Sequence, residues 1–298
     1  MIFKIIKFTI TIFLFFIVSC SEKNDVVKND IVSKNSVSTL IHDGIIREYL
    51  LYIPEEYDTS LSSPLLFNFH GFGGTANQHM YTADMRPVAD TAGFILVYPQ
   101  GLNSDDGSPH WNTAEIGEDN KSKSDDFGFI EALINELSLN YNINQNKIYA
   151  CGYSNGAGFI FSLACHLDRF SSIASISGSM GDWALENCNP TKPVGVMILH
   201  GTSDYSRPYD GIDGYLLSVD EAIEYWSDFN NTDSIPNVIN FNDGNNSIEY
   251  IQYLNGDNNS SVEHYKINNG DHIWFNFIHE GKVTNQVIWN FLSKHSRD

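Results

Sequence analysis

The sequence predicts one α/β domain with a mostly parallel sheet that is covered by helices on both faces. The chain has 298 residues and is 42% hydrophobic, which is enough for one large core. Short apolar runs, typical of strands buried on both faces, alternate with segments of helical periodicity. One such run, residues 147–151, ends in Gly152-Tyr153-Ser154-Asn155-Gly156 and passes directly into a helix-like segment. No internal repeat or linker divides the domain.

The first nineteen residues are predicted to be a secretory signal outside this domain. Lys4 and Lys7 precede an apolar run that is too short to be a convincing membrane span. Residues 17–20 resemble a bacterial lipobox, which implies cleavage before Cys20 and lipidation of its thiol and new amino group. The alternatives are an ordinary signal peptide and an uncleaved anchor. We expect residues 20–36 to be a flexible polar tether and residues 37–298 to be the catalytic domain.

The charge of the chain limits its partners. Removal of residues 1–19 takes away two lysines and no acidic residue, so the formal net charge changes from −20 to −22. Such a surface repels nucleic acid and anionic headgroups. We therefore expect no nucleic-acid partner, and membrane contact only through the N-terminal lipid. The expected location is the extracytoplasmic side of the cell envelope, or the medium if the protein is released.

The strands are recognised from apolar runs and turn signals. A hairpin is expected at Asp43-Gly44, and Pro54 ends its second strand. The run before His70 is continuously apolar, as in a strand buried on both faces. The predicted strands are residues 37–41, 48–53, 64–69, 94–98, 147–151, 172–176, 194–199, 247–253 and 262–267.

The helices are recognised from their apolar periodicity and caps. Asp125-Asp126 is a helix cap, and Pro87 is expected to break the first helical segment. Residues 101–124 are too long for an ordinary connection, which favours a functional loop at the mouth of a site. Residues 230–247 are rich in Asn and Asp and are expected to be a loop. The predicted helices are residues 77–91, 127–140, 159–165, 219–229 and 283–295.

Ser154 is the predicted nucleophile, because a serine on so sharp a strand-to-helix turn has an exposed hydroxyl. A serine hydroxyl needs a base, and on this architecture the chain order is serine, acid, histidine. His272 follows a strand and precedes the last helix, where such a base belongs. His264 is expected to be a structural or surface residue, His295 is expected to be solvated, and His279 has no assigned role.

Asp204 is the predicted acid, because it follows the buried strand 194–199 and faces the same rim as the serine. Asp210 and Asp213 are the alternatives. The oxyanion is expected to bind the N–H groups of Asn155 and Phe72. His70 is expected to brace the glycine-rich loop that contains Phe72.

The remaining cysteines are assigned by position and compartment. Cys151 lies inside a strand and is expected to be a buried apolar residue. Cys165 and Cys188 could form a disulfide after export, and two free thiols are the alternative. Neither C-x-x-C nor H-E-x-x-H spacing occurs, so the sequence gives no case for zinc.

Five motifs in register carry a family resemblance over roughly residues 45–295. Together they resemble the secreted polyhydroxybutyrate depolymerase and feruloyl esterase group, relatives of carbohydrate esterase family one. The resemblance implies an α/β-hydrolase fold, a Ser154–Asp204–His272 triad and a Cys165–Cys188 bridge. Phe275 and Ala157 depart from residues common in the group, and the first could reshape the pocket beside the base. The five motifs are His70-Gly71-Phe72-Gly73-Gly74, Asp125-Asp126-Phe127-Gly128-Phe129-Ile130, Gly152-Tyr153-Ser154-Asn155-Gly156, His200-Gly201-Thr202-Ser203-Asp204 and Gly270-Asp271-His272-Ile273-Trp274.

These residues predict a serine carboxylester hydrolase that requires no metal or organic cofactor. The expected substrates are a hydroxyalkanoate polyester or its oligomers, or feruloyl and acetyl esters of polysaccharides. Trp111 and Trp274 are the predicted substrate-binding residues, with Phe72 and Trp183 as further candidates for the pocket lining. The rival interpretations are a serine peptidase of the same fold and a catalytically silent carbohydrate-binding protein of the envelope.

Overall fold

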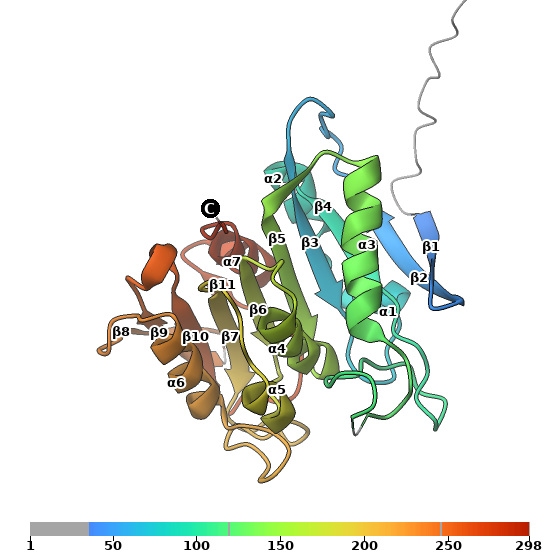
Figure 1. Cartoon of the computed structure of the whole chain (residues 1–298). Coiled ribbons are helices and arrows are strands. Elements are labelled where there is room, and N and C mark those ends of the chain that lie inside the picture. Colours follow the sequence, from blue (N-terminus) through green and yellow to red (C-terminus); the bar gives the residue numbers. More distant parts are fainter. Residues whose placement is uncertain (1–35, 119, 245, 298) are drawn as a thin grey trace, which may run out of the picture. The chain divides into compact units, whose positions relative to one another are not determined.

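The computed structural model describes residues 36–118, 120–244 and 246–297 (Figure 1). The predicted signal peptide, the lipidation site Cys20 and residues 20–35 of the tether lie outside the described residues. Within the described part, no helix combines the length and apolar character needed to cross a membrane. The residues described from Ser36 onward belong to one compact unit.

A ten-stranded sheet in the order β1-β2-β4-β3-β5-β6-β7-β10-β9-β8 forms the centre of this unit. The six central strands, from β4 to β10 in that order, pair in parallel. The flanking strands β1, β2, β9 and β8 pair antiparallel. The strands are β1 Ser36–His42, β2 Ile45–Tyr52, β3 Ser63–Phe69, β4 Ile95–Pro99, β5 Ile143–Tyr153, β6 Ser172–Ile176, β7 Gly195–Gly201, β8 Asn237–Asp243, β9 Asn246–Tyr253 and β10 Val262–Asn268.

Helices cover both faces of the sheet, each over its own apolar core. Side chains of α3, α4, α5 and α6 pack into one core, and Figure 1 shows these helices in front of the sheet. Side chains of α1, α2 and α7 pack into the other. The predicted mostly parallel, two-faced architecture is therefore confirmed. The helices are α1 Ala76–Thr82, α2 Arg86–Ala92, α3 Asp126–Asn140, α4 Asn155–His166, α5 Asp182–Glu186, α6 Val219–Phe229 and α7 Thr284–Leu292.

The local signals place the first elements correctly. Asp43 and Gly44 both have positive φ, 50° and 75°, as a tight hairpin turn requires. Asp125 caps α3 by accepting a hydrogen bond from the N–H of Gly128. Pro87 lies in the first turn of α2, where its missing N–H costs nothing, so it starts a helix after the break near residue 85.

Three expectations differ from the structure. The predicted loop 230–247 contains strand β8, whose side chains are mostly exposed because it is an edge strand paired only with β9. The short helix α5 and the hairpin of β11 Ile278–His279 with β12 Lys282–Val283 were not expected. His295, expected to be solvated, is 5% exposed, because the end of α7 packs against the start of β7.

The parallel strands end at one rim and deliver the site residues there. The loops that carry His70, Ser154, Asp204 and His272 follow β3, β5, β7 and β10, respectively. The carboxyl ends of these strands, where an open α/β sheet binds its ligands, thus carry every predicted catalytic residue.

Candidate active site

Ser154 occupies a sharp turn between β5 and α4. Its backbone has φ 55° and ψ −115°, a combination that an L-residue rarely adopts. The flanking glycines leave room for the crossing chain. A Cβ on Gly152 would lie 2.6 Å from the carbonyl carbon of Gly156, and one on Gly156 would lie 2.5 Å from the carbonyl oxygen of Phe69. The turn therefore requires the glycines that the sequence supplies.

The structure brings Ser154, His272 and Asp204 together in one hydrogen-bonded row. The Oγ of Ser154 lies 2.9 Å from Nε2 of His272, and Nδ1 of His272 lies 2.8 Å from Oδ2 of Asp204. The alternatives Asp210 and Asp213 instead line a hollow of about 450 Å³ beside α5. This geometry suits a nucleophile, a base and an orienting acid in that order.

The Asp204 carboxylate is held in its ionised form. Its other oxygen, Oδ1, accepts hydrogen bonds from the N–H groups of Ser206 (2.9 Å) and Arg207 (2.8 Å). Burial alone would raise the pKa of Asp204, but the hydrogen bonds from His272 and the Arg207 amide outweigh it and lower that pKa. A negative charge at this point can orient the imidazole and stabilise its cation.

Two side chains that the sequence did not single out fix the loop that contains His272. The hydroxyl of Tyr153 donates to the carbonyl of His272 over 2.9 Å, and the two rings lie 5.1 Å apart. The hydroxyl of Ser177 donates to the carbonyl of Ile273 over 2.7 Å. Burial and the nearby Asp204 charge raise the pKa of Tyr153 to about 12, so its hydroxyl remains a donor. The signal available in the sequence was that Tyr153 directly precedes Ser154.

The loop after β3 lies directly beside Ser154. A Cβ on Gly71 would lie 3.1 Å from Cβ of Ser154. Nδ1 of His70 donates to the carbonyl of Gly71 (2.8 Å), while its Nε2 accepts from the N–H of Gly101 (3.0 Å). Burial lowers the pKa of His70 to about 4, so the imidazole is neutral and braces the loop. Among the described residues, the structure gives the N–H of Phe72 no protein acceptor.

Trp111 does not have the role predicted for it. Its side chain is 1% exposed and stacks on Phe159 with ring centroids 5.2 Å apart, so it is not free to line a substrate pocket. The ring is buried because Phe69 of β3 and Phe159 of α4 pack against it. Trp274 is half-buried, and its indole N–H donates to Asn285. It lines a hollow of about 320 Å³ with Tyr81, and its contact with substrate stays a prediction.

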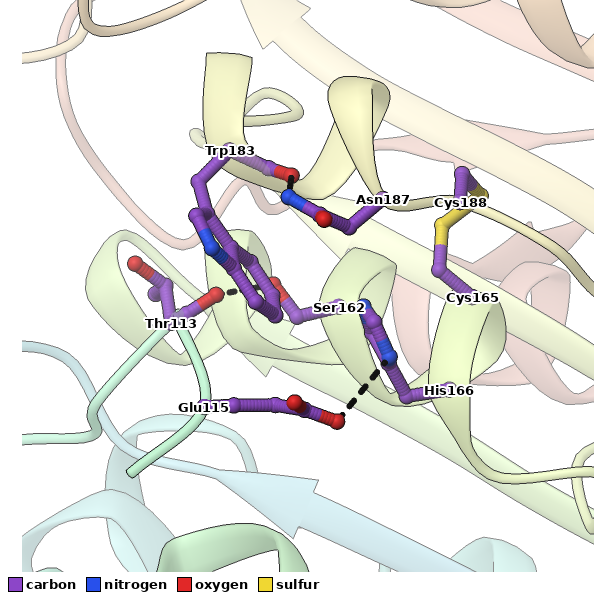
Figure 2. Close-up of a disulfide and its surroundings, with 8 residues drawn as sticks. All are labelled: Thr113, Glu115, Ser162, Cys165, His166, Trp183, Asn187 and Cys188. Atoms are coloured by element: carbon purple, nitrogen blue, oxygen red, sulfur yellow. Dashed lines mark hydrogen bonds and ion pairs between the residues drawn. A yellow bond between two sulfur atoms is a disulfide. The ribbon is translucent and has the colours of Figure 1, made fainter. Parts of the chain in front are cut away.

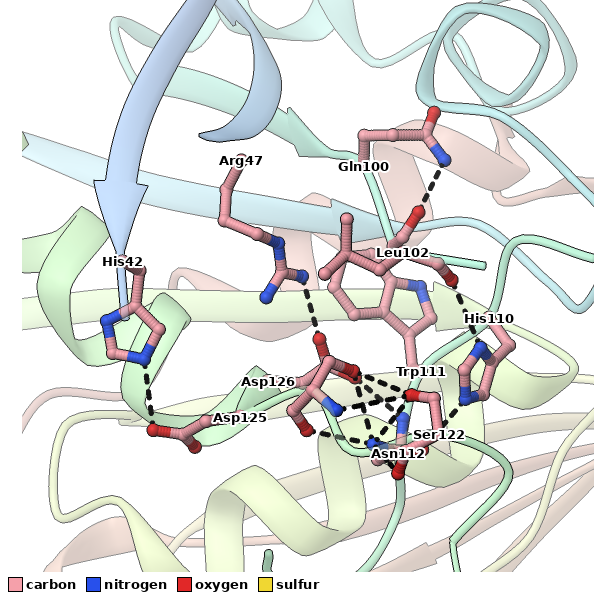
Figure 3. A network of polar contacts seen from close by, with 12 residues as sticks. His42, Arg47, Gln100, Leu102, His110, Trp111, Asn112, Ser122, Asp125 and Asp126 are labelled. Atoms are coloured by element: carbon pink, nitrogen blue, oxygen red, sulfur yellow. Dashed lines mark hydrogen bonds and ion pairs between the residues drawn. The ribbon is translucent and has the colours of Figure 1, made fainter. Parts of the chain in front are cut away.

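The long loop 101–124 is anchored through buried polar groups, as Figure 3 shows. The carboxylate of Asp126 accepts from Arg47 and from the backbone N–H of Asn112, at 2.7 and 2.8 Å. Burial raises the pKa of Asp126, and the Arg47 guanidinium opposes that shift. The side chain of Asn112 donates to the carbonyl of Ser124. The loop is therefore fixed to the start of α3.

Cys165 and Cys188 are joined as a disulfide (Figure 2), so the pairing implied by the resemblance is confirmed. The bond links the end of α4 to the segment after α5. On α5, the ring of Trp183 stacks on His166 at 4.8 Å, and Nδ1 of His166 lies 3.5 Å from Glu115 of the long loop. Trp183 is thus packed against protein on one face.

Two other groups that could carry chemistry, a buried thiol and a cluster of possible metal ligands, have structural roles instead. Cys151 is fully buried, and burial raises the pKa of its thiol, so it is a packing residue as expected. His42, Asp43 and Asp125 offer ligand atoms within 4.8 Å of one another. However, the Asp125 carboxylate caps α3 and pairs with His42 at 3.0 Å, and the positive end of the helix disfavours a cation there.

Two exposed aromatic rings come from loops that carry the site. Phe72 is 41% exposed in the loop beside Ser154, and the ammonium of Lys121 lies 4.3 Å from its ring centroid. Tyr205 is 78% exposed, and its ring lies 6.3 Å from that of His272. Tyr205 was not predicted to lie at the site, although its position directly after the predicted acid Asp204 indicated this. Both rings are partly exposed to solvent.

A parallel sheet with a serine on a sharp turn after β5, a carboxylate after β7 and a histidine after β10 is characteristic of the α/β-hydrolase fold. Solved structures agree with this fold. An acetyl xylan esterase from Aspergillus awamori superposes with a TM-score of 0.60 at 14% identity, covering 87% of this chain and 99% of that one. A thermostable esterase gives 0.59 at 15% identity, covering 89% and 64%.

Curated relatives are esterases. The putative esterase NocK of Nocardia uniformis subsp. tsuyamanensis is 30% identical over 50% of this chain and 42% of its own length. A probable feruloyl esterase C of Aspergillus terreus is 29% identical over 55% and 57%. A bifunctional acetylxylan esterase/xylanase, XynS20E of Neocallimastix patriciarum, is 24% identical over 67% and 27%.

The chain thus spans about half the length, or less, of these curated relatives. No family model matches it. The resemblance inferred from the sequence motifs is confirmed at the level of esterases of the α/β-hydrolase fold.

Proposed function

We propose that the protein is a serine carboxylester hydrolase with Ser154 as nucleophile, His272 as base and Asp204 as the orienting acid. The observation that carries the proposal is the position of His272, whose two ring nitrogens lie 2.9 Å from Ser154 Oγ and 2.8 Å from Asp204 Oδ2. The esterase names of the curated relatives support the same reaction class.

The proposed reaction has two halves. Nε2 of His272 takes the proton of Ser154 while Oγ attacks the ester carbonyl, and the new oxyanion binds the N–H groups of Asn155 and Phe72. The tetrahedral intermediate expels the alcohol, which leaves with the proton from His272 and gives the acyl-enzyme. Water then repeats the sequence, releasing the carboxylic acid and free Ser154. The chemistry uses no metal or organic cofactor.

The proposed substrates are feruloyl or acetyl esters of polysaccharides, or a hydroxyalkanoate polyester and its oligomers. The relatives named feruloyl esterase and acetylxylan esterase favour the polysaccharide esters. The exposed rings of Phe72 and Tyr205 beside the triad would suit a phenolic acyl group. Hydrolysis of methyl ferulate, acetylated xylan and polyhydroxybutyrate, measured side by side, would identify the class.

The central experiment is the hydrolysis of p-nitrophenyl acetate by wild type and by Ser154→Ala. We expect the variant to retain its fold and to lose at least about 10³-fold in kcat, because the attacking oxygen is gone. Cys151→Ala is the matched control, because that thiol lies three residues away and is buried. Full activity in Ser154→Ala would refute the assignment of the nucleophile.

Two other functions would give different results. A peptidase of the same fold would cleave aminoacyl amides in preference to esters. A catalytically silent carbohydrate-binding protein would retain xylan without turning over any ester. The complete serine–histidine–aspartate row favours the esterase, because a binding protein has no need of that row.

We also propose that the mature protein is held on the extracytoplasmic side of the envelope by lipid on Cys20, and otherwise has no membrane or nucleic-acid partner. The basic start, short apolar run and lipobox-like residues 17–20 support this proposal. Cys20→Ala should yield protein that carries no lipid, as mass spectrometry of the N-terminal peptide would report. A variant that is still lipidated would rule out the proposal.

A further inference from the structure

Trp111 connects the two segments that carry the proposed oxyanion donors. Its indole N–H donates to the carbonyl of His70 over 3.1 Å, at the start of the Phe72 loop. Its backbone N–H donates to the side-chain oxygen of Asn155 (2.8 Å), and its backbone carbonyl accepts from the side-chain amide of Asn155 (3.0 Å). One buried residue is therefore hydrogen-bonded to both segments that would surround the oxyanion.

These bonds determine where the N–H of Phe72 points. In a planar trans peptide the C=O and N–H groups point in opposite directions. The carbonyl of Gly71 accepts from Nδ1 of His70 (2.8 Å) and from the N–H of Gly74 (3.1 Å), which turns the N–H of Phe72 to the other side. The bond from Trp111 to the carbonyl of His70 holds the preceding peptide group as well.

The carbonyl of His70 is confined between Trp111 and the elbow. A Cβ on Gly156 would lie 2.5 Å from that carbonyl oxygen, so the loop is already in contact with the first turn of α4. On its other side the carbonyl contacts the indole of Trp111, which two rings hold in place. The indole stacks on Phe159 and packs edge to face against Phe69, each with ring centroids 5.2 Å apart.

We propose that Trp111 is a positioning residue of the oxyanion hole, one that sets the distance and direction between the N–H groups of Phe72 and Asn155. The inference rests on the proposed function. Trp111 has no access to substrate, but it should still affect the transition state. Donors stabilise an oxyanion only if they already point at it, and Trp111 holds the segments that carry both donors. A displacement of about 1 Å at such a site can cost about 10²-fold in rate.

The first test compares Trp111→Phe with Trp226→Phe. Phenylalanine keeps an aromatic ring at either position and removes the indole N–H. Trp226 is equally buried, lies on α6, and has no hydrogen-bond partner for its Nε1 among the described residues. Trp111→Phe also deprives the carbonyl of His70 of this donor, so its Tm should fall further than that of Trp226→Phe. Kinetics are therefore measured below the unfolding transition of each variant, where a difference reports on the bond to His70.

We expect Trp111→Phe to lower kcat for p-nitrophenyl acetate about 10- to 100-fold, with KM changed less than about threefold. The inhibition constant of phenylboronic acid, whose serine adduct is tetrahedral like the intermediate, should rise by a similar factor. Trp226→Phe should change both values less than about twofold. If folded Trp111→Phe behaves like Trp226→Phe, the inference is wrong.

A second pair of variants keeps the inference testable if Trp111→Phe does not fold. Asn155→Ala removes the side chain that holds Trp111 but keeps the Asn155 backbone N–H. Asn230→Ala is its match, because Asn230 holds Val194 by the same two bonds, at 3.0 and 2.7 Å. Only Asn155→Ala should lower kcat and weaken boronate binding. Equal kinetics in the two variants would overturn the inference.

Failure of the proposed function would look different. A fluorophosphonate probe should label Ser154 in wild type. If wild type is neither labelled nor active on any ester, the proposed function fails and the inference fails with it. If wild type is labelled and active but all four variants match it in kcat, only the positioning role of Trp111 is lost.

Discussion

The hydroxyl of Tyr153 donates a hydrogen bond to the carbonyl oxygen of His272 over 2.9 Å. Tyr153 immediately precedes Ser154 on the chain, so the loop of His272 is bonded to the strand-to-helix turn itself. Tyr153 therefore helps to set the distance between Ser154 and His272, in addition to the strands that precede these two residues.

Tyr153→Phe should lower kcat by roughly 3- to 10-fold and the free energy of unfolding by about 1 kcal/mol, because one partly buried hydrogen bond is lost. Ester hydrolysis and urea unfolding measure the two effects. Tyr225→Phe, on α6, is the control and should leave kcat unchanged. A Tyr153→Phe variant with wild-type kcat and reduced stability would show that the bond is structural only.

Asp204→Asn should lower kcat by about 10⁴-fold, because the amide cannot stabilise the His272 cation and favours the wrong tautomer. Asp210→Asn and Asp213→Asn should retain wild-type kcat, since these residues line a different hollow. Hydrolysis of p-nitrophenyl acetate measures all three. Loss of activity in Asp210→Asn or Asp213→Asn, with Asp204→Asn active, would reassign the acid.

His295 should make the protein less stable in mild acid. Burial lowers its pKa from 6.5 to about 4, so between these pH values the unfolded chain binds a proton that the folded chain excludes. Stability is therefore lost as the pH falls through this window, by about 2 kcal/mol for His295 between pH 7 and pH 5. Urea unfolding of His295→Gln should show a smaller loss over the same range. An unchanged loss would contradict the role of His295.

Removing the disulfide should destabilise the fold without altering the triad. The bridge closes a separation of 23 residues, which corresponds to about 3 kcal/mol in the chain-entropy model. Cys165→Ser with Cys188→Ser should lose roughly that amount in urea unfolding, with kcat nearly unchanged at low temperature. Cys151→Ala serves as the comparison, because that thiol is not part of the bridge and alanine adds no buried polar group. Equal stability in oxidised wild type and the double variant would contradict the expectation.

The sequence predicted the parallel core and the row of Ser154, His272 and Asp204 well, for a physical reason. Parallel strands buried on both faces are continuously apolar, and their ends fall at one rim, so residues far apart in the chain can be assigned to a common place. The edge strand β8 lacked this signal, because its side chains are mostly exposed and its order comes from pairing with β9.

The supporting residues were less predictable because their roles depend on tertiary contacts. Trp111 was expected to face substrate, but it is buried by Phe69 and Phe159, which come from two other elements. His295 lies near the chain end, where solvation is common, and is buried by packing against β7. Neither contact leaves a periodic pattern in the sequence.

The backbone conformation of Ser154 sets the stability of the fold against the proposed reaction. Its φ of 55° with ψ of −115° is costly for a residue with a Cβ, by about 1–3 kcal/mol, but ordinary for glycine. Ser154→Gly should therefore unfold at a higher urea concentration than wild type while having no nucleophile. Selection for stability alone would replace the serine with glycine. A chain selected for the proposed reaction should instead retain the serine, although its turn is strained.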